Sequence, residues 1–380
     1  MIRIPPPWKG ERAEEIWALY RYLLYQTLPF EPEDYLPRDS TGAYYYKDGD
    51  PTKEKVYPAS RSFKLSSDGE KILSAASQPA PSTLEETIQL ASPELHDYLY
   101  ENHAVQREHL IELLTTQTDE KTVRAKKLVF RTNPALEKLL LREVFNYSAF
   151  SAKSRFPELV RMMGVEVCPY CNRSFTTTAK IRKGEYHRQN QVDHYRAKSK
   201  YPWFALTLPN FIPACGNCNL RKSDTDDCVL YPYTEGFDDK YHFRTKLVSG
   251  LGYLTGADSD PEEFEVEIVP YPGAALDCDP DYEKRVKTSI DKFGLDVLYR
   301  ESHNAYVCNI YEQRYIFDDA YLDSLINSFP DLFQSREEAR SLLYMRRYDG
   351  DSLGASPLAR LTHDIDEEIS RLHDALNVKR

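Results

Sequence analysis

Two pairs of cysteines are the residues of this 380-residue chain whose type and spacing most clearly predict chemistry. Cys168 and Cys171 form one Cys-x-x-Cys pair, and Cys215 and Cys218 form the other. Together the pairs supply four soft thiolate ligands, a set that suits a tetrahedral zinc ion. We therefore expect a structural zinc site held by these four cysteines.

The first pair, in the stretch VCPYCNRSF, also reads like the redox pair of a glutaredoxin. A redox pair needs its first cysteine at a helix N-terminus, whereas the NRSFTTT that follows here is poor in helix-forming residues. A thiol–disulfide site and buried cysteines without metal remain the alternatives to zinc. Cys228, Cys278 and Cys308 have no partner at metal-ligand spacing, and we expect them in the core.

Polar residues between the two pairs have the types that phosphodiester cleavage requires. A neutral imidazole can deprotonate water near neutral pH, which makes His194 the candidate general base. A hard divalent cation needs oxygen ligands, and Asp193 and Asn219 can supply them. Neighbouring side chains point to opposite faces of a strand, so Asp193 and His194 can serve one site only where the chain bends or leaves the strand. We therefore expect His194 at the end of the second strand of a hairpin. Asn219 is expected in the first turn of the following helix.

Basic residues are concentrated in the same stretch. The chain as a whole has a formal net charge of −11, which disfavours nucleic-acid binding by most of its surface. Between Cys168 and Lys222, however, ten residues are basic and only two are acidic. A basic island in an acidic chain is typical of a phosphate-binding site. We expect Arg196, Lys198 and Lys222 to contact phosphate groups, with an ordinary solvated face as the alternative.

The elements that must position these residues divide the chain into three predicted regions. Residues 1–163 are expected to form a helical N-terminal domain, with helices over 10–28, after a capping box at Ser82–Glu85, and twice within 121–163. Residues 36–62 read as a loop. Residues 164–228 contain a predicted hairpin around Lys183-Gly184 and a helix from Cys215. In the third region, 229–380, two β-rich stretches (240–256 and 262–273) precede further helices.

The order of the polar and cysteine residues resembles that of the HNH nuclease family. Cys-x-x-Cys is followed by Asp-His and then by NFIPACGNCNLRK, and the resemblance covers about 55 residues. It implies a ββα-metal finger in which His194 is the general base and Asn210 orients it. It also implies that Asp193 and Asn219 bind one Mg²⁺ or Mn²⁺ ion. Asn219 stands where other members have a final histidine, which disfavours a catalytic zinc.

These observations together predict an α+β fold. The expected chain is mainly helical, with a central zinc-stapled ββα-metal finger over 164–228, a small β-rich segment and C-terminal helices. The predicted function is a metal-dependent endonuclease that hydrolyses phosphodiester bonds, of DNA rather than RNA. A non-catalytic zinc module that binds nucleic acid or protein is the alternative.

A looser resemblance extends beyond the cysteines and the candidate site residues. VDHYRAKSKYP and SIDKFGLDVLY are similar to HNH proteins of bacterial anti-phage systems of the Septu and retron-associated type. That resemblance implies a defence role beside an ABC/AAA-type ATPase partner, and the acidic helical regions are expected to bind a protein partner or form a homodimer. No apolar run of membrane-spanning length and no secretory signal are visible, so we expect a cytoplasmic protein without membrane contact.

Overall fold

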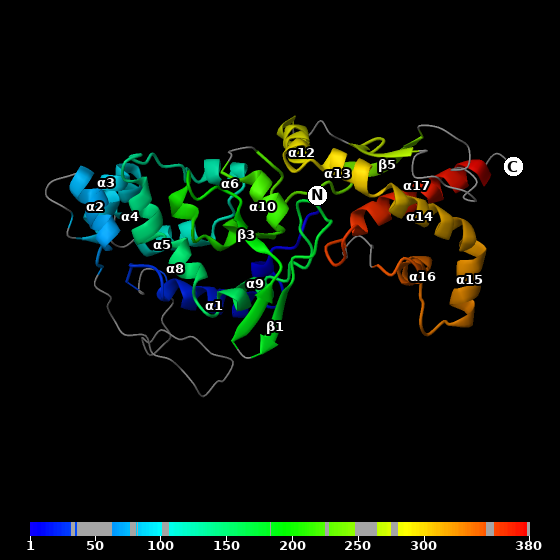
Figure 1. The fold of residues 1–380 in the computed structure, drawn as a ribbon, viewed down its shortest axis with the longest axis horizontal. Helices are drawn as coiled ribbons and strands as arrows, with labels where there is room; N and C mark the ends of the chain where they lie inside the picture. The colour runs from blue at the N-terminus through cyan, green and yellow to red at the C-terminus, as the bar shows by residue number, and fades with distance from the viewer. Residues whose placement is uncertain are drawn as a thin grey trace.

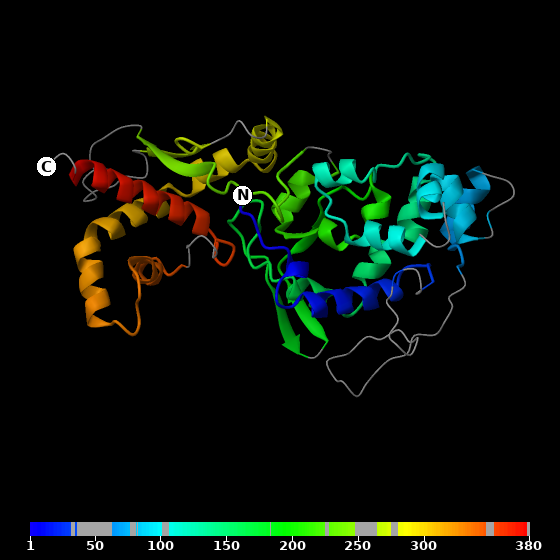
Figure 2. The ribbon, with the colours of Figure 1, turned by 180° about the vertical axis from the view of Figure 1, so that it is seen from behind.

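The computed structural model describes residues 1–31, 35, 63–76, 81, 83–100, 106–182, 184–224, 228–247, 264–274, 280–346 and 353–377. Within these residues the chain is mainly helical, with three separate antiparallel strand pairs, which confirms the predicted predominance of helix. The molecule is elongated: helices from the first half lie at one end, helices from the last third lie at the other, and the N-terminus lies between them (Figures 1 and 2). None of the described helices has both the length and the hydrophobicity needed to cross a bilayer.

The N-terminal lobe consists of short helices. They are α1 (Ala13–Tyr25), α2 (Ser67–Ala76), α3 (Leu84–Ala91), α4 (Pro93–Tyr100), α5 (Gln106–Thr115), α6 (Glu120–Ala125), α7 (Glu137–Leu139), the π-helical turn η3 (Leu140–Val144), α8 (Tyr147–Ser151) and α9 (Phe156–Met162), with the 3-10 turn η1 (Pro7–Lys9) before α1. Helix α1 confirms the predicted helix over 10–28. The region 121–163 contains more and shorter helices than the two expected. The predicted loop over 36–62 lies entirely outside the described residues.

The capping box of α3 is one residue later than the sequence suggested. Thr83, not Ser82, is the N-cap: its Oγ1 accepts a hydrogen bond from the backbone N–H of Glu86 at 3.1 Å. The carboxylate of Glu86 accepts in return from the backbone N–H of Thr83 at 3.3 Å. Two of the N–H groups that a helix start leaves unpaired are thereby satisfied.

The central region contains two strand pairs rather than one hairpin. Strands β1 (Thr178–Arg182) and β2 (Glu185–Arg188) form the predicted hairpin, in which Gly184 has a φ of 80°. Strand β3 (Gln191–His194) does not continue that hairpin; it pairs with β4 (Phe211–Ala214), and helix α10 (Gly216–Lys222) follows. The expectation that His194 ends the second hairpin strand is therefore wrong, because β2 ends at Arg188 and His194 ends a separate strand. Two short 3-10 turns, η4 (Pro202–Phe204) and η5 (Leu208–Asn210), connect β3 to β4.

The C-terminal lobe begins with a third strand pair, β5 (Tyr241–Leu247) and β6 (Phe264–Pro270), which confirms the two predicted β-rich stretches. The helices that follow are α12 (Pro280–Phe293), α13 (Leu295–Ser302), α14 (Asn304–Ile316), α15 (Asp319–Ser328), α16 (Arg336–Leu343) and α17 (Ala359–Asn377). Helix α17 packs along β5, and Asp364 of α17 accepts a 2.9 Å hydrogen bond from the backbone N–H of Phe243.

One hydrophobic core runs through all three predicted regions. Buried residues such as Leu23 of α1, Ile212 of β4 and Ile365 of α17 belong to the same cluster. A second, small cluster of Leu322, Phe333 and Ala339 lies under α15 and α16. The finger is therefore packed between the two lobes rather than suspended on linkers, and the predicted boundaries at 163 and 228 remain predictions.

Candidate metal centre and finger

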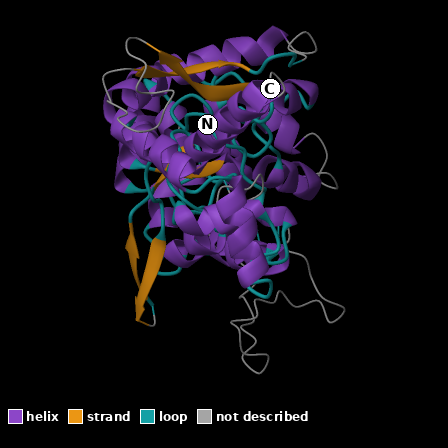
Figure 3. Ribbon diagram, turned by 90° about the vertical axis from the view of Figure 1, so that its right-hand side faces the viewer, coloured by secondary structure: helices purple, strands orange, loops and turns teal. Residues whose placement is uncertain are grey.

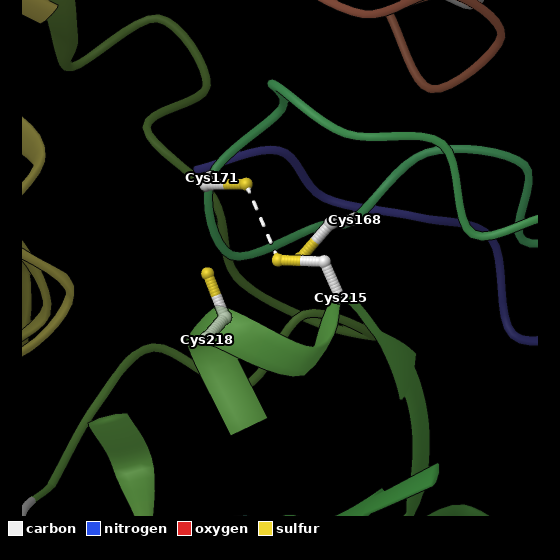
Figure 4. Close-up of side chains that lie close together, drawn as sticks. All are labelled: Cys168, Cys171, Cys215 and Cys218. Carbon is white, nitrogen blue, oxygen red and sulfur yellow. Dashed lines mark hydrogen bonds between the residues drawn. The ribbon is translucent and has the colours of Figure 1, made fainter. Parts of the chain in front are cut away.

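The four cysteines of the two pairs converge from two elements far apart in the sequence. Cys168 and Cys171 lie in the turn before β1, while Cys215 is the N-cap of α10 and Cys218 lies in its first turn (Figure 4). All four Sγ atoms lie within 4.8 Å of one another, and the Sγ atoms of Cys171 and Cys215 are 3.9 Å apart. Tetrahedral zinc–sulfur bonds of about 2.3 Å place sulfurs about 3.8 Å apart. The cluster therefore fits a structural zinc ion.

The surroundings of the cluster favour a metal over a redox pair. None of the described cysteines forms a disulfide. Burial raises the pKa of the Cys168 thiol, so a bound cation would favour its thiolate form. Among the remaining cysteines, Cys308 is buried as predicted, whereas Cys228 is only half-buried and donates to Glu120 at 2.9 Å. Cys278 lies outside the described residues.

Asn172 anchors the first cysteine pair to the C-terminal lobe. Its backbone is left-handed, with a φ of 51°. Its carbonyl accepts from the N–H of Leu358, its Oδ1 accepts from the N–H of Arg360 and its Nδ2 donates to the carbonyl of Leu353. From the same lobe, the Tyr299 hydroxyl donates to the carbonyl of Cys171 at 2.7 Å. The backbone around the first cysteine pair is thus held by residues that lie 128 to 188 positions later in the sequence.

Asp193 lies on the face of β3 that meets α10. Its Oδ2 accepts a 2.6 Å hydrogen bond from Tyr170 and lies 3.1 Å from Nζ of Lys222. Nζ of Lys222 also donates to the backbone carbonyl of His194 at 2.7 Å. The side chains of Asp193 and Lys222 are 5% and 2% exposed, so this is a buried ion pair rather than a surface contact. The ammonium group of Lys222 is therefore the cation that lies beside this carboxylate.

His194 points to the opposite face of β3, toward the N-terminal lobe. Its Nε2 lies 3.0 Å from the carbonyl of Ala205. Since a carbonyl only accepts, Nε2 carries the proton and Nδ1 is the unprotonated nitrogen of the neutral ring. The ring edge packs against Tyr147 and Phe211, with centroids 4.4 and 5.5 Å away. Burial, aided by the nearby charge of Lys198, lowers the pKa of His194 to about 3.

Asn210 organises the loop that holds His194, and none of its side-chain hydrogen bonds to described residues goes to the ring. Its Oδ1 accepts from the backbone N–H of Arg196 at 2.7 Å and from the Thr118 hydroxyl at 3.1 Å. Its Nδ2 donates to the carbonyls of Arg196 and Phe204, both at 3.0 Å. Phe204 directly precedes Ala205, the residue that fixes the His194 ring. Asn210 is therefore placed to position the imidazole through the backbone.

Asn219 ends the first turn of α10, close to where the sequence predicted it. Its Nδ2 donates to Oε1 of Gln191 at 2.6 Å, which leaves its own Oδ1 available as an acceptor. Gln191 is two residues before Asp193 on β3, so the two side chains lie on the same strand face. The structure thus brings Asn219 and Asp193 to one β3–α10 interface. No hydrogen bond among the described residues joins either of them to the ring of His194.

The three predicted phosphate contacts differ in their environments. Lys222 is buried in the ion pair with Asp193. Arg196 is mostly buried, donates to the carbonyl of Thr118 at 3.0 Å and lies 3.8 Å from Glu120. Lys198 is exposed; its Nζ lies 4.8 Å from the centre of the Tyr147 ring, and it lines a cavity of about 480 Å³ together with Tyr147, Asn146 and Ser148.

Sequence reasoning missed two residues that contact this site. Tyr170 lies inside the first cysteine pair, and its hydroxyl donates to Asp193. Tyr147 comes from α8 and covers the imidazole of His194. Tyr170 could have been noticed because it is held between two candidate zinc ligands. No sequence signal connects Tyr147 to a histidine 47 positions later, since only the tertiary fold brings α8 against β3.

Comparison with known proteins supports one assignment for this region. Residues 168–225 match the family model described as HNH endonuclease. That range contains all four cysteines together with β3, β4 and α10, and it supports the resemblance seen in the sequence. Comparisons of the chain with curated proteins and with solved structures gave no match.

Proposed function

We propose that this protein is a metal-dependent HNH endonuclease that hydrolyses phosphodiester bonds, with DNA favoured over RNA. The observation that carries the proposal is the arrangement within residues 168–225. A ββα unit presents Asp193 and His194 at the end of its first strand, and its helix begins at a four-cysteine cluster. The family match covers the same residues.

In the proposed reaction His194 acts as the general base. The carbonyl of Ala205 fixes Nε2–H, so Nδ1 is the nitrogen that would take a proton from water. Asn210 is a positioning residue, because it holds the backbone on both sides of the imidazole. The exposed Lys198, beside the cavity next to Tyr147, would contact a phosphate group of the substrate.

Asp193 and Asn219 are the proposed ligands of a Mg²⁺ or Mn²⁺ ion, since both offer oxygen atoms at the β3–α10 interface. When bound, such an ion supplies positive charge to the scissile phosphate and the leaving oxygen. Lys222 would have to release the carboxylate of Asp193 for this ion to bind, and Tyr147 would have to uncover His194. The structure therefore corresponds to a closed state in this proposal. Cys168, Cys171, Cys215 and Cys218 are the proposed ligands of a structural Zn²⁺ ion.

The burial of His194 favours a second candidate function. A zinc-stabilised module that binds nucleic acid or protein without cleaving it would have no need of an accessible base, and His194 is only 7% exposed. In that case Asp193 and Lys222 would form a purely structural ion pair.

A plasmid-nicking assay separates the two functions. Wild-type protein with Mg²⁺ or Mn²⁺ is expected to nick supercoiled DNA, whereas His194→Ala is expected to retain zinc and fold but lose nicking. His373→Ala, which removes an exposed histidine of α17, is the matched control and should nick like the wild type. Equal nicking by His194→Ala and wild type, or no nicking by either, would favour the binding module. Running the assay in parallel with RNA tests the preference for DNA.

The proposed cellular setting is bacterial anti-phage defence, beside an ABC/AAA-type ATPase in the cytoplasm. Its support is the similarity of VDHYRAKSKYP and SIDKFGLDVLY to HNH proteins of such systems. Co-expression with any ABC/AAA-type ATPase found to be encoded beside its gene tests this proposal. A stable complex is expected, and nicking by the complex should differ between ATP-bound and nucleotide-free conditions. Light scattering of the purified protein decides between a monomer and the homodimer considered above.

A further inference from the structure

The hairpin β1–β2 is an exposed basic projection. Its eleven residues, 178–188, include four basic residues and one acidic residue in a chain whose net charge is −11. Most of its described residues are exposed, and the side chain of Arg182 is 80% exposed. Ile181 beside it is an apolar residue with 61% exposure. Figures 1 and 3 show both strands extending away from the helical body.

The base of this hairpin is fixed, although its end projects. Asn190, which is buried, donates through Nδ2 to the hydroxyl of Thr178 at 2.9 Å. The hydroxyl of Thr177 donates to Oε1 of Gln189 at 2.7 Å, which closes the two strands at their base. The guanidinium of Arg188 lies over the ring of Phe156 on α9, 5.4 Å from its centre. The hairpin is thus held as a rigid extension of the body.

The same anchor sets its position relative to the finger. Strand β2 ends at Arg188 and β3 begins at Gln191, so only two residues separate the hairpin from the strand that carries Asp193 and His194. A ligand gripped by the hairpin would therefore lie at a defined distance from the finger.

The basic residues of the finger itself are less suited to a first contact with a polyanion. Lys222 is buried against Asp193, and Arg196 is held by Thr118 and Glu120. Lys180 and Arg182 are instead exposed on the hairpin, where Arg182 pairs only with the neighbouring Glu185 among the described residues. Lys198, Lys200 and Arg221 of the finger are exposed as well, but only the hairpin presents its exposed basic residues on a projecting two-stranded ribbon.

We propose that β1–β2 is an arm that enters a groove of double-stranded nucleic acid and contacts its phosphates through Lys180 and Arg182. This inference rests on the proposed nuclease function and names how its substrate is held. A two-stranded β-ribbon fits the major groove, which is about 12 Å wide, and phosphate contacts fix the register of a protein on a duplex. Because the chain as a whole is acidic, this arm would add to the phosphate contact proposed for Lys198 and strengthen binding.

The test compares duplex binding by Lys180→Ala/Arg182→Ala with binding by the full-length wild type. Fluorescence anisotropy with a labelled DNA duplex of about 30 base pairs, in Ca²⁺ to prevent cleavage, gives the affinity at several salt concentrations. The double variant is expected to bind about tenfold more weakly, and the slope of log affinity against log salt should fall by about 2, since each lost phosphate contact removes about 0.9. Lys246→Ala/Arg131→Ala removes two exposed charges elsewhere and should change neither quantity.

Unchanged affinity and salt slope in Lys180→Ala/Arg182→Ala would overturn the proposal that the hairpin binds nucleic acid. An equal loss of affinity for a single strand of the same sequence would overturn the assignment to a duplex groove. Failure of the arm is distinguishable from failure of the nuclease proposal, because His194→Ala is expected to bind the duplex with wild-type affinity while losing nicking. Loss of nicking without loss of binding supports the catalytic assignment whatever the hairpin variant does.

Discussion

The ammonium group of Lys222 lies 3.1 Å from Oδ2 and 3.2 Å from Oδ1 of Asp193, and both side chains are buried. The hydroxyl of Tyr170 completes the environment of the carboxylate. Removing one partner of such a pair leaves an uncompensated buried charge, which costs more than the pair itself contributes. This relationship gives a direct test of whether the carboxylate of Asp193 accepts a metal ion.

Replacing Lys222 by methionine should make the stability of the protein depend on magnesium. The free energy of unfolding is expected to fall by about 3–5 kcal/mol, because Asp193 loses its counter-charge. Added Mg²⁺ should restore part of the loss by taking the place of the ammonium group. Urea unfolding with and without Mg²⁺ measures both effects, with the exposed Lys246→Met as control. A magnesium response no larger than that of the wild type would show that Asp193 is not a metal ligand.

Removal of zinc should unfold the region between the lobes. One zinc ion per chain is expected by elemental analysis, and Cys215→Ser should lose it and lower the melting temperature, because four thiolates in a buried pocket need a cation. Cys308→Ser is the matched control, since Cys308 is equally buried but lies outside the cluster. Full zinc content in Cys215→Ser, or a disulfide between Cys168 and Cys171 in the purified protein, would contradict the assignment.

Substitution of Tyr147 should uncover His194. In Tyr147→Ala the ring that packs at 4.4 Å is removed, so water reaches the imidazole and the pKa of His194 should rise from about 3 toward the usual value near 6.5. Tyr147→Phe keeps the aromatic cover and should leave the low pKa in place. A pH titration of the His194 ring protons by NMR reports the difference directly. The same low pKa in both variants would show that other contacts bury the ring.

Acid stability should depend on Asp364. Burial alone would raise the pKa of Asp364, but the Arg360 charge, His363 and the N–H of Phe243 lower it below its ordinary value. A carboxyl whose pKa is depressed in the folded state stabilises the protein above its unfolded pKa of about 3.9, and this contribution is lost as the pH falls through the folded value.

Asp364→Asn is therefore expected to be destabilised at neutral pH and to approach the wild type as the pH falls below about 4. Melting temperatures of both proteins across this range measure the convergence. Asp281→Asn, at an exposed position in α12, should run parallel to the wild type. A difference in melting temperature between Asp364→Asn and wild type that stays constant across this pH range would mean that ionisation of Asp364 does not stabilise the fold.

Much of the finger could be predicted from the sequence, because its chemistry depends on residue type and spacing. The four cysteines meet as the two short pairs suggested, and α10 begins at the second pair. Strand pairing was harder: alternating apolar residues reveal strands but not partners. The turn signal at Gly184 was correct for β1 and β2, yet β3 pairs with β4 instead of extending the hairpin.

Burial of charged residues could not be predicted from local sequence. Lys222 is of a residue type that often contacts phosphate, but its position on α10 buries it in an ion pair with Asp193. Tyr147 illustrates the same limit, because its contact with His194 depends on how α8 packs in the tertiary fold. Contacts between elements that are remote in the sequence produce no periodicity or residue spacing from which they could be predicted.

The dependence of Asn172 on residues 353–360 has a consequence for biosynthesis. All four cysteines leave the ribosome well before the backbone groups of Leu353, Leu358 and Arg360 that bond to Asn172. An ion captured during translation would hold the two cysteine pairs in their final arrangement while the last helix is still being synthesised. Metal supply would then act as a template for docking of the C-terminal lobe, and zinc-starved cells would accumulate chains whose two ends fail to assemble.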